Sequence, residues 1–149
     1  MKYYSYRYIN KDGEEKELKL RLSSADAMEL EASKKMSISE FMENESMSTI
    51  VTMLRYLRKW EEKNFSLGQA QILYDELIDS GLTYKTILLD VIYEALVVSG
   101  FLEKDEWEEM KKKIKEIGKE AIKILSQEQK SYFMMNYCNM IYNIVSYMK

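Results

Sequence analysis

The stretch YYSYRYINKDGEEKELKLRL at residues 3–22 decides how this chain begins to fold. Three tyrosines alternate with other residues before a turn at residues 10–13, and three leucines alternate after it: Tyr4, Tyr6, Tyr8, Leu18, Leu20 and Leu22. A period of two is typical of a β-strand with one buried face. The Asn-Lys-Asp-Gly turn suits a hairpin. The pattern therefore predicts antiparallel strands at about residues 3–9 and 15–22, with the Tyr/Leu face packed on helices.

The rest of the chain has a helical pattern. After Ser23 the apolar spacing changes to about 3.6, and no proline interrupts it. We expect helices at about residues 23–35, 37–43, 46–60, 66–80 and 83–99, and two more beyond residue 102. The first should bury Met28 and Ala32, and the third should bury a stripe formed by Met47, Ile50, Val51, Leu54 and Leu57. The fold class predicted is mainly α (α+β): an N-terminal antiparallel β-hairpin packed on a five- to six-helix bundle.

We divide the chain into a hairpin-plus-helical core at residues 1–102 and a helical extension at residues 103–149. The first helix of the extension has an apolar face with heptad-like steps of three and four residues: Trp107, Met110, Ile114, Ile117, Ala121 and Ile124. This face packs on its own domain, or it is a seam through which two copies associate. The sequence leaves both readings open.

The last segment, residues 131–148, contains no charged residue. A membrane span is not the reading we favour, because asparagines recur along one helical face and buried amides are costly in hydrocarbon. The opposite face is apolar: Phe133, Tyr137, Ile141, Ile144 and Met148. This helix is either part of the core or a surface that docks a partner protein, and these five residues are the candidate partner-binding face.

The composition argues against catalysis. The chain has 149 residues, one cysteine and no histidine, so the commonest general base and metal ligand is missing. Asp75, Glu76 and Asp79 offer only oxygen atoms, a weak pattern for calcium or magnesium. We predict no enzyme activity, no cofactor and no metal. The net charge of −3 disfavours nucleic acid, and the tyrosine-rich start lacks the apolar stretch of a signal peptide. We expect a cytoplasmic protein.

The order of elements suggests a family. The hairpin runs into LKLRLSSADAMELE at Leu18–Glu31, a medium-length helix ends near Trp60, and paired short helices end in ALVVSGFL at Ala95–Leu102. In these features residues 3–102 resemble the tail assembly chaperones of long-tailed phages and prophages of Gram-positive hosts. No signature motif is involved, so the resemblance supplies no site residues.

The resemblance implies a role without chemistry. Such chaperones bind the long, helical tape measure protein and keep it soluble until tail tube subunits assemble around it. The implied partners are therefore the tape measure protein and the tail tube protein, with possible homo-oligomers. The implied location is the host cytoplasm and not the mature virion. The alternative is a small phage or host adaptor or regulator that acts through protein contacts.

Overall fold

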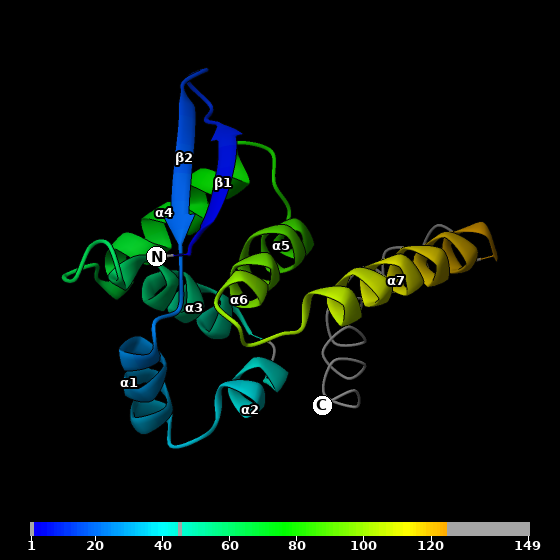
Figure 1. Cartoon of the computed structure of the whole chain (residues 1–149). Helices are drawn as coiled ribbons and strands as arrows, with labels where there is room; N and C mark the ends of the chain where they lie inside the picture. Colours follow the sequence, from blue (N-terminus) through cyan, green and yellow to red (C-terminus); the bar gives the residue numbers. More distant parts are fainter. Residues whose placement is uncertain (1, 45, 125–149) are drawn as a thin grey trace.

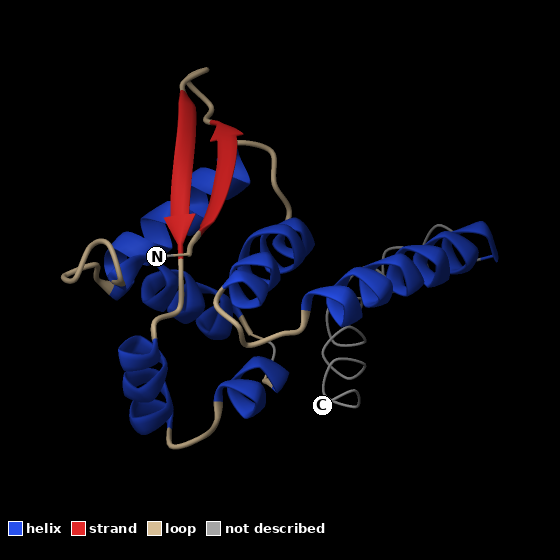
Figure 2. Cartoon of the chain, in the orientation of Figure 1, coloured by secondary structure: helices blue, strands red, loops and turns tan. Residues whose placement is uncertain are grey.

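A computed structural model of the chain describes residues 2–44 and 46–124. The protein is mainly helical with an N-terminal antiparallel hairpin, which confirms the predicted fold class (Figure 2). Strand β1 (Tyr4–Ile9) pairs with β2 (Glu15–Leu20), and Tyr4 lies opposite Leu20. The predicted alternation is correct, because the buried apolar positions of the hairpin and of the residues just after it are Tyr8, Leu18, Leu20 and Leu22.

The turn between the strands is fixed by one buried side chain. The Asn10 side-chain oxygen accepts hydrogen bonds from the backbone N–H groups of Asp12, at 3.0 Å, and Glu14, at 2.9 Å. Gly13 has a φ of 82°, a left-handed conformation that glycine adopts at little cost. The turn therefore holds the hairpin tip in one shape.

Seven α-helical segments follow the hairpin in the described part of the chain (Figure 1): α1 (Ser24–Lys34), α2 (Ile38–Glu43), α3 (Met47–Lys59), α4 (Leu67–Asp79), α5 (Tyr84–Thr86), α6 (Glu94–Val98) and α7 (Lys104–Ile124). A hydroxyl side chain caps the start of each of the first five by accepting a backbone N–H three residues on: Ser23, Ser37, Ser46, Ser66 and Thr83. Among the described residues, none of the helices is long and apolar enough to cross a membrane.

Helix α3 is the centre of the fold. It contacts α1, α4 and β2, and Ile50, Met53, Leu54 and Leu57 along it are fully buried. The hairpin is joined to it by the Arg21 N–H, which donates to the Leu57 carbonyl at 3.0 Å. The stripe predicted for this helix is buried as expected except at Met47, whose side chain is 49% exposed.

The predicted buried face of α1 is wrong. Met28 is 70% exposed and Ala32 is exposed, whereas Ala27 and Leu30 are buried. The helix packs on α2 and α3 through the face that carries Leu30. Because alanines and Met28 surround Leu30 in the sequence, several helical phases look equally apolar, and packing selects one of them.

Residues 84–98 form one continuous helix with an irregular middle. Between α5 and α6 lies η1 (Ile87–Tyr93), a seven-residue π-helical segment where a regular helix was expected. The positions predicted to be buried here are buried: Ile87, Leu88, Val91, Ile92 and Ala95. The Tyr4 hydroxyl donates to the Asp90 carbonyl of this segment at 2.8 Å, so the hairpin also contacts the π turn.

Candidate partner-binding groove

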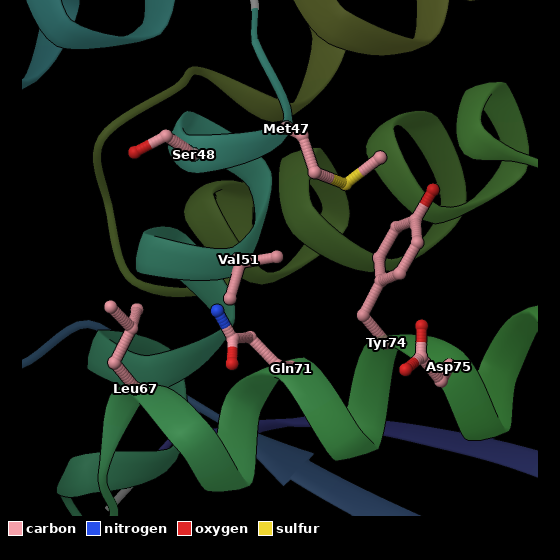
Figure 3. Close-up of a pocket in the computed structure, with 7 residues that line it drawn as sticks. All are labelled: Met47, Ser48, Val51, Leu67, Gln71, Tyr74 and Asp75. Atoms are coloured by element: carbon pink, nitrogen blue, oxygen red, sulfur yellow. The ribbon is translucent and has the colours of Figure 1, made fainter.

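An open groove of about 530 Å³ lies between α3 and α4 (Figure 3). Its lining is mostly apolar or uncharged: Met47, Ser48, Val51, Leu67, Gln71, Tyr74 and Asp75. Figure 3 shows Leu67 at one end of the α4 side and Tyr74 with Asp75 at the other, and Met47 extends toward Tyr74. The groove therefore has an apolar body and one acidic end.

Helix capping explains why apolar side chains are held at the rim. Ser46 caps α3, so Met47 is the first residue of that helix, and Ser66 forms a capping box with Gln69, so Leu67 is the first residue of α4. Met47 is 49% exposed and Leu67 is 44% exposed. Two large apolar side chains are thus fixed at the rim of the groove and only partly buried.

A second hollow, of about 350 Å³, adjoins the acidic end. It lies between α4 and the hairpin tip and is lined by Asn10, Lys11, Asp12, Ile72, Asp75, Glu76 and Asp79. Asp75 belongs to both hollows. The Tyr8 hydroxyl donates to Glu76 Oε2 at 2.7 Å, which joins the hairpin to α4 beside this hollow.

Burial and negative charge determine the ionisation of the tyrosine at the groove. Burial raises the pKa of the Tyr74 hydroxyl, and the neighbouring Asp75 carboxylate raises it further. Tyr74 is therefore a neutral phenol near pH 7, with no tendency to act as a base. Within the described residues, no three acidic or cysteine side chains are arranged to hold a metal ion.

The face predicted on the first helix of the extension lies on α7. Trp107, Met110 and Ile114 are buried in the hydrophobic core, while Ile117 is 43% exposed. Ala121 and Ile124 belong to the last turns of α7. The other predicted face lies outside the described residues: Phe133, Tyr137, Ile141, Ile144 and Met148.

The start of α7 is attached to α6 and η1 through Trp107. Its ring stacks on Tyr93 with 4.9 Å between ring centroids, and its indole N–H donates to Glu94 Oε1 at 3.1 Å. The Lys111 ammonium also binds Glu94 and pairs with Glu108 at 3.2 Å. Burial acts to lower the pKa of Lys111, but these two carboxylates outweigh it and raise the pKa above its usual value. Beyond this attachment α7 projects away from the hairpin (Figure 1).

Sequence reasoning did not identify the groove. The sequence pattern placed Met47 in the core and assigned no role to Leu67. Each of the two rim residues directly follows a capping serine, but so does the buried Ile38, so this signal alone does not identify a groove. Comparison of the chain with protein-family models, curated proteins and solved structures gave no match.

Proposed function

We propose that this chain is a non-enzymatic phage tail assembly chaperone that binds the tape measure protein and keeps it soluble while the tail tube assembles. The observation that supports this function best is the open groove between α3 and α4, with half-exposed Met47 and Leu67 at its rim. The order of elements along residues 3–102 supplies the link to the phage family.

The groove suits a helical client for physical reasons. An amphipathic helix binds such a surface by placing its apolar face between two helices of the host protein. Methionine adapts to different partners because its side chain is flexible and polarizable, which favours Met47 as a contact residue. A chaperone of this kind needs reversible contact and no reaction, in keeping with a groove whose lining contains one acidic side chain, Asp75, and no basic one.

The proposal also names a second partner of the chain and its location. The tail tube protein would be the second partner, the host cytoplasm the location, and the mature virion would lack the chain. An adaptor or regulator without catalytic activity is the second candidate. The short length of the groove favours this second candidate. Helix α4, which forms one wall, has 13 residues from Leu67 to Asp79 and measures roughly 20 Å. That length holds one short helical segment.

The proposal predicts that a long helical protein, the tape measure protein, is encoded beside this chain, and co-expression with that protein tests it. We expect that protein to become soluble and to co-purify with several copies of the chain, as measured by pull-down and light scattering. The variants Met47→Asp and Leu67→Asp place a charge at the groove rim. Both positions are exposed first-turn residues, where aspartate interacts favourably with the helix dipole, so folding is preserved.

The matched control is Met28→Asp, which adds the same charge at a 70% exposed methionine on α1, outside the groove. The groove variants should lose solubilisation while the control retains it. If the long protein stays insoluble with the unaltered chain, the chaperone proposal is wrong. If both groove variants still keep the long protein soluble, the binding site lies elsewhere on the chain.

A further inference from the structure

We infer that the groove selects helices whose apolar stripe is followed by lysine or arginine at the end that lies near Asp75. This inference rests on the proposed helix-binding function and adds the chemistry of the partner. The docking site then comprises the apolar groove, the adjoining acidic hollow and the shared carboxylate of Asp75.

The charges of the second hollow carry the argument. Four carboxylates line it, on Asp12, Asp75, Glu76 and Asp79, against one cation, Lys11. Lys11 lies 4.0 Å from Asp79, and both side chains are more than half exposed, so this ion pair neutralises little. The exposed Asp75 has no ion-pair or hydrogen-bond partner among the described residues. A cationic side chain therefore finds uncompensated negative charge here.

The position of these acids on α4 strengthens the argument. Asp75, Glu76 and Asp79 lie in the last turns of the helix, and its last turn contains no basic residue. Carbonyl groups at a helix C-terminus already create negative potential, so acidic residues there oppose the stability of α4. Residues that lower the stability of their own helix in this way are typical of a binding site. Both the carboxylates and the helix dipole therefore favour the binding of a cationic side chain from a partner.

The geometry lets one partner helix reach both hollows. Leu67, Gln71, Asp75 and Asp79 are four residues apart, so they form one ridge along α4 that runs from the apolar groove to the acidic hollow. Ile72, which is 70% exposed, gives the acidic hollow an apolar contact as well. The stem of a lysine could lie against Ile72 while its ammonium meets the carboxylates.

The chain's own residues 131–148 are an alternative occupant, because they carry no charge themselves but Lys130 and Lys149 lie directly at their two ends. We assign the site to a basic amphipathic helix of the client protein, because the proposed function requires such a partner. A second copy of this chain and the chain's own segment are outcomes that the experiment separates.

The test uses the full chain and designed helical peptides of about 14 residues, roughly four turns. The first peptide has leucines on one face and lysines at one end. The second has glutamates in place of those lysines, and the third keeps the lysines but replaces the leucines with serines. Fluorescence anisotropy gives the affinity of each. We expect the first to bind best, and salt to weaken it by screening.

Charge variants of the protein complete the test. The double variant Asp75→Asn, Asp79→Asn should bind the lysine peptide with about five-fold lower affinity, the effect of losing two exposed ion pairs. Its affinity for the glutamate peptide should not fall. The matched control is Glu106→Gln with Glu109→Gln, two exposed carboxylates on α7 that line neither hollow. This control should bind the lysine peptide as the unaltered chain does.

The outcomes separate this inference from the proposed function. Equal binding of the lysine and glutamate peptides, unchanged by the aspartate variants, would overturn the charge selection and leave a helix-binding groove. Absence of binding by every peptide would overturn the inference, and co-expression would then decide the chaperone function independently. A stronger affinity in the Phe133→Asp variant would place the chain's own segment in the groove. Dissociation of an oligomer by Leu67→Asp would place a second copy there. Either of these two results would overturn the inference.

Discussion

Replacing Trp107 with alanine removes the side chain that attaches α7 to the rest of the fold. The indole is 2% exposed, stacks on Tyr93 and donates to Glu94. A buried aromatic side chain removes roughly 200 Å² from water, which at about 25 cal/mol per Å² corresponds to about 5 kcal/mol. Alanine retains part of this, and the unfolded chain is already partly compact. We expect the free energy of unfolding to fall by about 3–5 kcal/mol.

Urea denaturation followed by far-ultraviolet circular dichroism measures this loss, because the signal does not depend on the tryptophan that is removed. The matched variant Trp107→Phe keeps a ring against Tyr93 but loses the hydrogen bond to Glu94, so we expect a loss of about 1–2 kcal/mol. A loss below about 1 kcal/mol for Trp107→Ala would refute the reasoning, since it would show that α7 does not unfold together with the helices before it.

Two further predictions concern the hairpin and α1. Burial, with help from Glu94 and Asp90, raises the pKa of Tyr4 to about 12 from 10.0. The stability linked to this group is complete below the unfolded value and is lost as the pH rises through the folded value. Unfolding followed against pH should therefore show stability falling between those values, and less steeply in Tyr4→Phe. At the end of α1, Lys35 has a φ of 54°, so Lys35→Gly should stabilise the protein by about 0.5–1 kcal/mol in thermal melts. Lys34→Gly, at the last residue of the helix, should destabilise it.

Much of the fold could be predicted because its elements have strong local patterns. The period of two in the hairpin placed Leu18 and Leu20 in the core, and the spacing along α3 and residues 84–98 identified their buried faces. The phase of α1 could not be predicted, because a short helix rich in alanine has no single apolar face. The π-helical turn likewise left no mark in the spacing of apolar residues.

The candidate groove was harder to predict for a different reason. Its walls come from two helices that are separated in the sequence. Residues at its rim, such as Met47, are of the apolar types that usually lie in a core. Sequence periodicity indicates which face of a helix is apolar, but it does not indicate where two apolar faces fail to cover each other. That gap depends on how α3 and α4 cross, which the sequence pattern does not specify.

The π-helical segment η1 also determines the rotational setting of everything that follows it. Each residue of an α-helix turns the chain by about 100°, and a π-helical turn takes up about one extra residue. If the same residues were wound as a regular α-helix, α6 would therefore be rotated by roughly that angle. Ser99, whose hydroxyl accepts the Leu22 N–H at 2.9 Å, and Glu94, which binds Trp107, would both be turned away from their partners. The wide turn thus sets the phase of both attachments, one to the hairpin and one to α7, relative to the buried residues of η1, and a regular helix of the same length would lose both.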